Sequence, residues 1–505
     1  MPALTLMVVG TASSAGKSLL VTAFCRIFRR RGWSVAPFKA QNMSLNSFVT
    51  PEGGEIGRAQ ASQAEAAGLP PSVLMNPILL KPTTNRKSQV IVRGRVEADL
   101  DAPDYYAVKG RWRPVVLESF RVLAGRHQAV IIEGAGSPAE INLMEGDFVN
   151  LGLAAEIGAP ALLVGDIDRG GVFAALYGTV QLMPPRERAM IKGLVINKFR
   201  GDPTILEPGL QRLEELLGLP VLGVMPYAKF ALDEEDSLTD RLEQRGFDAE
   251  VKLAVVRLPR LSNFTDFAVF DALPGVGLRY VDEPASLAGA DLIILPGSKN
   301  TLEDMVFLEK SGLAGAVRRA AAAGTVVMGL CAGFQMLGRM IHDPHGVESG
   351  LGSVPGLGLL EVETTFARDK RTVQAAHRLR PAAGPLAETG GLNLAGYEIH
   401  MGETSLSPGQ APLADDLADG RPTGAVRADG RVFGSYLHGF FDNLDFTRRF
   451  LAGLHRLRPG GQPGGETSGP ATYQEIKERE YERLADLVEA SLPFEKIMAI
   501  MEAGG

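Results

Sequence analysis

The chain has 505 residues, of which 45% are hydrophobic and 22% are charged. This balance is typical of a folded globular protein, and the length predicts two or three domains. Lysine and arginine total 52 against 59 aspartate and glutamate residues, giving a net charge of -7. A mildly acidic chain without a basic block argues against sequence-independent nucleic-acid binding.

Only two cysteines occur, Cys25 and Cys331, which excludes a disulfide framework and suits a reducing compartment. The N-terminal segment MPALTLMVVG lacks the basic region and cleavage site of a signal peptide, and no apolar run is long enough for a membrane span. We therefore expect a soluble, cytoplasmic protein with no membrane partner. The oligomeric state is left open by these observations.

Short apolar segments alternate with helical patterns along the chain, which predicts an α/β protein with two doubly wound, mostly parallel sheets. The first series of predicted strands is LTLMVVG, WSVAPF, AVIIEG, ALLVGD, GLVINK and PVLGVMP. The second series is VKLAVVRLP, ADLIILPGS and TVVMGLCAG, followed by a β-rich region over 357–436.

These patterns predict an organisation into domains and linkers. We expect a first domain over 1–230, an acidic linker over 231–250 and a second domain over 251–457. The Gly/Pro-rich segment RPGGQPGGETSGP predicts a flexible linker over 458–471. The amphipathic remainder, 472–505, is expected to form a helix or helix pair that packs on one of the domains.

The first predicted strand ends in GTASSAGKS, which has the order of a phosphate-binding loop: strand, small residues, Gly-Lys-Ser, helix. Gly16 would let the backbone approach phosphates, Lys17 would supply a positive charge, and the Ser18 hydroxyl would bind Mg²⁺. Five residues separate the two glycines of the motif, so Thr11 takes the position of the usual first glycine. The nucleotide-binding candidates in this loop are Gly10, Thr11, Ala15, Gly16, Lys17 and Ser18.

A nucleotide site also needs carboxylates for its metal ion. Glu133 ends the strand AVIIEG, at the edge where a parallel sheet places its ligands. Glu55 in GGEIGRAQA is a second candidate, although a loop glutamate is often only a solvated side chain. Asn197 ends another strand and is a candidate for reading an adenine edge, with a plain turn as the alternative. Asp168 in GDIDRGG has three alternatives: Mg²⁺, substrate, or the following helix N-terminus.

The motifs GTASSAGKS, EGAGS and NKF resemble those of the dethiobiotin synthetase group of P-loop amide-forming enzymes. The resemblance implies that ATP phosphorylates a carboxylate or carbamate, which a nitrogen nucleophile then attacks. It also implies that Lys17 and Ser18 are the P-loop pair, that Glu55 and Glu133 are metal carboxylates, and that Asn197 contacts adenine.

Cys331 stands in TVVMGLCAGFQMLG, between a predicted strand and a predicted helix. Gly329 and Gly333 flank it at the G-x-C-x-G spacing of a nucleophile elbow, and the following helix N-terminus favours a thiolate. Among the seven histidines, His438 in VFGSYLHGFFDN follows a strand and is the expected base, with His400 in GYEIHMGET as the alternative.

The motifs LPGSKNT, GLCAGFQMLG and YLHGFF resemble the class I glutamine amidotransferase domain. The resemblance implies that Cys331 attacks the side-chain amide of glutamine, that His438 moves the protons, and that the backbone N–H groups of Gly297 and Ala332 form the oxyanion hole. Enzymes of that class place a glutamate two residues after the histidine, but Phe440 stands there in this chain. The third member of the site is therefore missing or supplied from elsewhere, with Glu398 and Asp442 as candidates.

The order of the two halves, together with PFKAQNMSLNS, VGDIDRGG, NKFRGD, LSNFTDF and GYEIHMG, resembles the cobyric acid synthase family over nearly the whole chain. The resemblance implies ATP- and glutamine-dependent amidation of the b, d, e and g carboxylates of adenosylcobyrinic acid a,c-diamide. The small-molecule partners would be glutamine, ATP and the corrinoid, with ATP and Mg²⁺ as cofactors. Candidate substrate-binding residues are Gln41, Asn42, Asp168 and Arg169.

Three alternatives remain open from the sequence. One is the sister enzyme type, cobyrinate a,c-diamide synthase, which shares both halves and takes other carboxylates. Another is a P-loop partitioning or switch ATPase, which would have no use for an elbow cysteine. The third is a sensor whose amidotransferase half is an inactive binding module, as the residue at Phe440 would allow.

Overall fold

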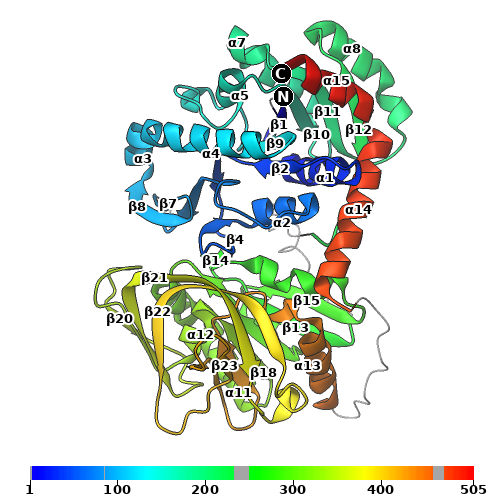
Figure 1. The fold of residues 1–505 in the computed structure, drawn as a ribbon. Coiled ribbons are helices and arrows are strands. Elements are labelled where there is room, and N and C mark those ends of the chain that lie inside the picture. The colour runs from blue at the N-terminus through cyan, green and yellow to red at the C-terminus, as the bar shows by residue number, and fades with distance from the viewer. Residues whose placement is uncertain (1–2, 85, 233–248, 459–470, 505) are drawn as a thin grey trace.

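The computed structural model describes residues 3–84, 86–232, 249–458 and 471–504, and it places them in two α/β units, one above the other in Figure 1. Each unit is built around a six-stranded sheet in which most neighbouring strands are parallel. The two-sheet α/β fold expected from the apolar segments is therefore confirmed. Within the described residues, no helix is long and apolar enough to cross a membrane.

The first sheet has the strand order β12–β11–β10–β1–β9–β2, with every neighbouring pair parallel. Alternate residues of its central strand enter hydrophobic clusters on opposite faces: Met7 and Val9 in one, Leu6 and Val8 in the other. All six apolar segments of the first series are strands: β1 (Leu4–Gly10), β2 (Val35–Phe38), β9 (Ala129–Glu133), β10 (Ala161–Asp166), β11 (Ile191–Phe199) and β12 (Val221–Pro226).

Helices cover this sheet, because strands that are apolar on both faces must be shielded from water on both. The helices of the first unit are α1 (Lys17–Arg30), α2 (Arg58–Ala67), α3 (Ala102–Val108), α4 (Arg113–Arg126), α5 (Leu151–Ile157), α6 (Val172–Leu182), α7 (Pro185–Arg188) and α8 (Glu207–Leu217).

Two small β-structures extend from the first unit toward the second (Figure 1). One is a four-stranded sheet of β3 (Gln41–Met43), β6 (Ile78–Pro82), β7 (Lys87–Val92) and β8 (Arg95–Asp101). The other is the hairpin of β4 (Ser47–Val49) and β5 (Glu55–Gly57), whose second strand leads directly into α2.

The second sheet has the order β15–β13–β16–β18–β26–β25, in which only the terminal pair β25–β26 is antiparallel. Its strands are β13 (Val251–Val256), β15 (Val276–Val281), β16 (Leu292–Leu295), β18 (Val326–Leu330), β25 (Ala425–Val426) and β26 (Val432–Ser435). The helices packed around it are α10 (Thr301–Lys310), α11 (Leu313–Ala322), α12 (Ala332–Leu337) and α13 (Leu444–Arg456), with the 3₁₀ segment η4 (Phe264–Ala272).

The β-rich region forms a separate sheet around two long antiparallel strands, β21 (Val362–Leu379) and β22 (Asn393–Leu406). Short strands complete it: β19 (Met340–His342), β20 (Ser353–Pro355), β23 (Ala414–Asp416) and β24 (Pro422–Thr423). A two-stranded ladder of β14 (Leu261–Ser262) and β17 (Gly297–Ser298) lies at the edge of the second unit that faces the first.

The chain returns to the first unit at its C-terminal end. Helices α14 (Tyr473–Ser491) and α15 (Phe494–Gly504) contribute apolar side chains, Tyr481 and Met501 among them, to the same cluster as β1 and α1. Arg26 of α1 forms ion pairs with two glutamates of α14. The domain boundaries expected from the sequence stay predictions, and most of the two expected linkers, residues 233–248 and 459–470, lies outside the described residues.

Candidate functional site

The phosphate-loop motif connects β1 to α1 at the carboxyl edge of the first sheet. Gly16 has φ 99°, and a Cβ at this position would lie 2.0 Å from the amide nitrogen of Asn197, so only glycine fits. The Lys17 ammonium donates to the carbonyl of Ala12 at 2.9 Å, which folds the lysine back over the loop. The backbone N–H of Thr11 donates to Val164 at 2.9 Å, so Thr11 anchors the loop to β10.

Glu133 ends β9 beside this loop. Its carboxylate accepts hydrogen bonds from Ser18 Oγ at 2.8 Å, Lys39 Nζ at 2.8 Å and Gln63 Nε2 at 2.5 Å. Burial alone would raise the pKa of Glu133, but the ammonium of Lys39 and these hydrogen bonds hold it below its usual value. Lys17, Ser18 and Glu133 line one cavity, so the structure brings together the loop and one of the two predicted metal carboxylates.

The structure does not bring the other predicted metal carboxylate, Glu55, to this cavity. Glu55 is buried and paired with Lys81 at 2.7 Å and with Lys370 of the second unit. These lysines lower its pKa well below the usual range despite its burial. Both carboxylate oxygens of Glu55 are held by ammonium groups at the contact between the units, and its role as a metal ligand stays a prediction.

Asn197 lies at the end of β11, where its amide nitrogen donates to the carbonyl of Ala15 at 2.9 Å. The side chain of Asn197 is buried, and this hydrogen bond holds the phosphate loop in its conformation. A role at the adenine stays a prediction.

The four predicted substrate residues separate into two pairs. Gln41 and Asn42 of β3 line the cavity that contains Lys17 and Glu133, and Asn42 donates to Gln60 at 3.1 Å. Asp168 and Arg169 are exposed and are not among the residues that line this cavity. Asp168 is instead paired with Arg200 at 2.9 Å, and the contacts of the described residues do not connect this pair with the cavity.

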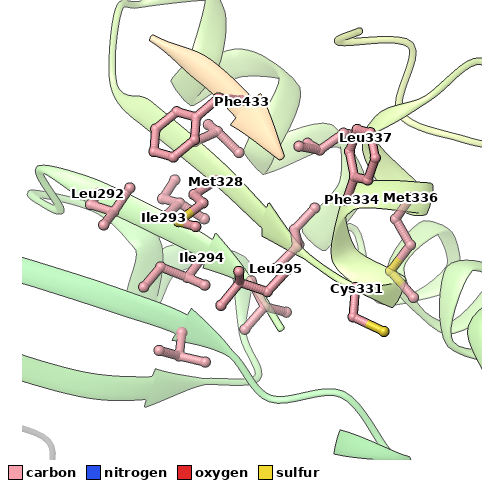
Figure 2. Packing of buried hydrophobic residues seen from close by; sticks show 14 of the residues in the cluster. Leu292, Ile293, Ile294, Leu295, Met328, Cys331, Phe334, Met336, Leu337 and Phe433 are labelled. Atoms are coloured by element: carbon pink, nitrogen blue, oxygen red, sulfur yellow. The ribbon is translucent and has the colours of Figure 1, made fainter. Parts of the chain in front are cut away.

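Cys331 follows β18 and precedes α12, with φ 52° and ψ -109°. A positive φ is costly for a residue with a side chain, and such strain is typical of a nucleophile elbow. The turn needs small neighbours: a Cβ on Gly333 would lie 1.9 Å from the carbonyl oxygen of Leu295. Figure 2 shows Cys331 at the margin of the packed apolar side chains of the second sheet. Cys25, by contrast, is completely buried in the core of the first unit.

His438 lies after β26 and lines the same pocket as Cys331, whose sulfur contacts the carbonyl of Ile399 at 3.5 Å. Its Nδ1 is 2.7 Å from a carboxylate oxygen of Asp266, and the other oxygen of Asp266 accepts the Gly439 N–H at 3.0 Å. Burial alone would lower the pKa of His438, but Asp266 and the neighbouring sulfur raise it to about 10. A cysteine and a histidine in one pocket, with an aspartate bonded to the histidine, are the groups that nucleophilic catalysis requires.

The carboxylate beside His438 is Asp266 rather than Glu398 or Asp442, the two candidates from the sequence. Glu398 is engaged by His377 at 3.3 Å, His400 at 3.5 Å and Arg371. Hydrogen bonds from these three side chains lower the pKa of Glu398 well below the usual range even though it is buried. His400, the alternative base, is held between this carboxylate and the ring of Tyr436, at a centroid distance of 3.8 Å.

The predicted oxyanion-hole residues lie on either side of the catalytic pair. Ala332 is the first residue of α12, directly after Cys331. Gly297 belongs to β17, and a Cβ at this position would lie 3.0 Å from Oγ and 3.2 Å from the carbonyl oxygen of Ser262 in the paired strand β14. This close approach favours glycine, while the hydrogen-bonding role of the two N–H groups stays a prediction.

Sequence reasoning missed Asp266 and Asn263, although both stand in LSNFTDF. Asn263 has φ 51°, and its amide nitrogen is 3.3 Å from Nδ1 of His438. The segment η4 that carries Asp266 is irregular and has no periodicity that marks an acid–base partner. The polar residues inside an otherwise apolar motif were the only available indication.

The β4–β5 hairpin brings the first unit against this second site. The Ser47 N–H donates to the side-chain oxygen of Asn263 at 2.9 Å, and the Phe264 N–H donates to that of Asn46 at 2.9 Å. Tyr397, whose ring stacks on His438 at a centroid distance of 5.3 Å, donates its hydroxyl to the carbonyl of Ser47 at 3.1 Å. Residues that touch the histidine are therefore held by the other unit.

Comparison with known proteins connects both sites to one family. Residues 6–238 match the CobQ/CobB/MinD/ParA nucleotide binding domain, and residues 252–446 match the CobB/CobQ-like glutamine amidotransferase domain. A cobyric acid synthase of Klebsiella pneumoniae (strain 342) is 49% identical over 99% of this chain and 98% of its own length. The chain belongs to the cobyric acid synthase family.

Two further members show the same full-length similarity. The cobyric acid synthase of Citrobacter koseri is 50% identical over 98% of each chain. That of Caldanaerobacter subterraneus is 48% identical over 99% of each chain. The similarity spans both units and the C-terminal helices, so the family resemblance read from the motifs is confirmed, and the chain is an ATP-dependent glutamine amidotransferase ligase of this family.

Proposed function

We propose that this protein uses glutamine and ATP to amidate the b, d, e and g carboxylates of adenosylcobyrinic acid a,c-diamide, giving adenosylcobyric acid. The observation that carries this proposal is the presence of two different reaction sites in one family member: Lys17, Ser18 and Glu133 around one cavity, and Cys331, His438 and Asp266 around another. One site activates a carboxylate, and the other releases nitrogen from glutamine.

The second site supports a cysteine-based hydrolysis of the glutamine amide. Cys331 attacks the side-chain carbonyl, and His438 gives a proton to the departing ammonia. The resulting glutamyl thioester is then hydrolysed by water, which returns the thiolate and releases glutamate. Asp266 keeps the imidazole oriented, and the N–H groups of Gly297 and Ala332 are proposed to stabilise the oxyanion. One such donor is typically worth about 10²–10³ in rate.

The first site supports phosphate transfer from ATP. Lys17 and the loop N–H groups would hold the phosphates, and a phosphorylated carboxylate then loses phosphate when ammonia attacks it. Gln41 and Asn42 line the same cavity and are proposed to contact the carboxylate substrate. Ammonia must reach this site unprotonated, which favours a route through the contact between the two units.

The residues present fit Mg²⁺. This ion is usually held by one or two carboxylates together with substrate phosphates, rather than by a cage of protein ligands. Ser18 and Glu133 supply two oxygen donors 2.8 Å apart beside the phosphate loop. A bound Mg²⁺ would neutralise phosphate charge as the bond to the γ-phosphate breaks.

Mass spectrometry of the corrinoid after incubation with ATP and glutamine tests the proposal directly. Each amidation replaces OH with NH₂, so the mass reports the number of steps. We expect the fully amidated product from the a,c-diamide, whereas activity only on the substrate that lacks the a and c amides would indicate the sister amidase. Absence of glutamate release with every acceptor would favour the switch ATPase or the inactive sensor.

The choice of base has its own test. His438→Ala is expected to abolish glutamate release. His400→Ala leaves Cys331 and His438 in place, so most of the glutamate release should be retained. Retained glutaminase activity in His438→Ala would transfer the base role to His400.

A further inference from the structure

The pocket at Cys331 is built by both units of the protein. It is lined by Cys331, His438 and other residues of the second unit, and also by Lys81 from β6 of the first. Lys81 donates to Ser47 Oγ at 3.0 Å and to Glu55 at 2.7 Å, both on the β4–β5 hairpin. A side chain of the synthetase half thus faces the glutamine-hydrolysing centre.

The walls of this pocket carry an excess of positive charge. Three lysines line it, Lys81, Lys299 and Lys370, whereas Glu348 is the only carboxylate among the described lining residues. Glu55 lies behind the pocket, and its two oxygens are already taken by Lys81 and Lys370. Burial, together with repulsion from the other two lysines, lowers the pKa of Lys370 to about 8. The three lysines outnumber the two nearby carboxylates, Glu348 and Glu55, so the pocket favours the binding of an anion.

Lys299 is the lysine of this pocket that is best suited to bind an anion. Within the described ranges, its ammonium makes no hydrogen bond and no ion pair shorter than 4.0 Å; burial lowers its pKa, and attraction to Glu348 is the main effect that opposes this. Lys299 is only partly buried, and an ammonium has three donors, so this group can bind the oxygens of a ligand in the pocket. Glu348 supplies the opposite charge: one of its oxygens accepts the Thr301 N–H at 2.7 Å, and burial raises its pKa to about 7.

We propose that the two units jointly form the subsite for the amino-acid end of glutamine, in which Lys299 and Lys81 bind the α-carboxylate and Glu348 binds the α-ammonium group. The proposal rests on the glutamine hydrolysis proposed above and adds residues that recognise the substrate. The side-chain amide of glutamine then extends toward Cys331, and its charged end is held at the contact with the first unit. The zwitterion carries an anionic group for the lysines and a cationic group for Glu348, whereas a phosphate would bind the lysines but not Glu348.

A joint subsite has a consequence for the reaction. Lys81 is fixed by Glu55 and Ser47, and the N–H of Ser47 also holds Asn263, which contacts His438. Glutamine is therefore bound well only when the hairpin of the first unit is in place. The arrangement links nitrogen release to the presence of the half that consumes it.

Substrate discrimination by the full chain tests this inference. Glutamine is compared with glutamine α-amide, in which an uncharged amide replaces the α-carboxylate and the side-chain amide is unchanged. Release of the γ-carboxylate product from each is followed by mass spectrometry. We expect Lys299→Met and Lys81→Met to lower kcat/KM for glutamine about 10- to 100-fold, mainly through KM, with little change for the α-amide. The preference of the unmodified protein for glutamine would then shrink by the same factor.

Lys477→Met is a matched control. Lys477 is a buried lysine paired with a glutamate, Glu65, where α14 meets α2, and it lines neither cavity. It should leave the preference for glutamine unchanged. Equal losses for glutamine and α-amide in both test variants would mean that the lysines are structural, and unchanged kinetics would place the carboxylate elsewhere; either result overturns the inference. A chain that releases no glutamate before any substitution would instead overturn the proposed function.

Discussion

Asp266 and His438 are 172 residues apart in the chain, and their carboxylate oxygen and Nδ1 are 2.7 Å apart in the fold. The aspartate reaches the histidine from η4, before the nucleophile in the sequence, and not from the position two residues after the histidine. Phe440 occupies that position, where its ring is buried and packs against Phe446. The absence of a glutamate there therefore does not imply an incomplete catalytic site.

Replacing Asp266 with a residue of the same shape should slow glutamine hydrolysis without changing the packing around His438. Asp266→Asn keeps the shape of the side chain but removes the charge that stabilises the imidazolium and fixes its tautomer. We expect kcat for glutamate release to fall by about 10²–10⁴, the usual range for general acid–base groups. Glu398→Gln and Asp442→Asn serve as comparisons, and an equal loss in either would contradict the assignment of Asp266.

The raised pKa of His438 also predicts how stability depends on pH. A histidine titrates near 6.5 in an unfolded chain, while His438 is raised to about 10 by Asp266 and the sulfur. Its protonation therefore stabilises the fold fully below pH 6.5, and this contribution is lost as the pH rises toward 10. In denaturant unfolding at pH 6.5, the unmodified protein should have a higher free energy of unfolding than Asp266→Asn. This difference should disappear as the pH approaches 10. A difference that stays constant over this range would contradict the ion pair.

The two reaction sites should be separable by single substitutions. Cys331→Ala removes the nucleophile, so glutamine no longer supports synthesis, whereas ammonium salt still does. Lys17→Ala removes the charge that holds the phosphates, so ATP turnover stops while the thioester at Cys331 still forms. Phosphate release and trapping of the thioester measure the two outcomes. Loss of ammonium-dependent synthesis in Cys331→Ala would show that the cysteine is structural, and unchanged phosphate release in Lys17→Ala would show that GTASSAGKS is not the nucleotide loop.

Glu133 and, as the weaker candidate, Glu55 were both predicted to be metal carboxylates, but their substitution should have different effects. Glu133→Gln removes a charge beside Ser18, so we expect ATP turnover to fall at least about 100-fold, with a higher Mg²⁺ requirement. Glu55→Gln should leave the Mg²⁺ requirement unchanged. It would instead destabilise the chain by about 3–5 kcal/mol, because Lys81 and Lys370 lose the buried carboxylate between them. Titration of ATP turnover with Mg²⁺ and denaturant unfolding distinguish these outcomes, and a shifted Mg²⁺ requirement in Glu55→Gln would restore it as a ligand.

The amino-acid sequence by itself determined the two sheets, the phosphate loop and the nucleophile elbow. Each depends on neighbours in the chain: continuous apolar runs form buried parallel strands, Gly16 permits a turn that a side chain would block, and small residues around Cys331 permit its strained backbone. Local sterics and hydrophobic periodicity can be read directly from consecutive residues.

Only the tertiary structure decided which charges meet. Glu55 and Glu133 stand in similar glycine-containing segments, yet the fold places one between two lysines and the other beside Ser18. In the same way, the fold places Asp266 beside His438, although Glu398 and Asp442 are closer to His438 in the sequence. The electrostatic partner of a buried group is set by distance in space, and contacts between residues remote in the chain leave no periodic pattern in the sequence.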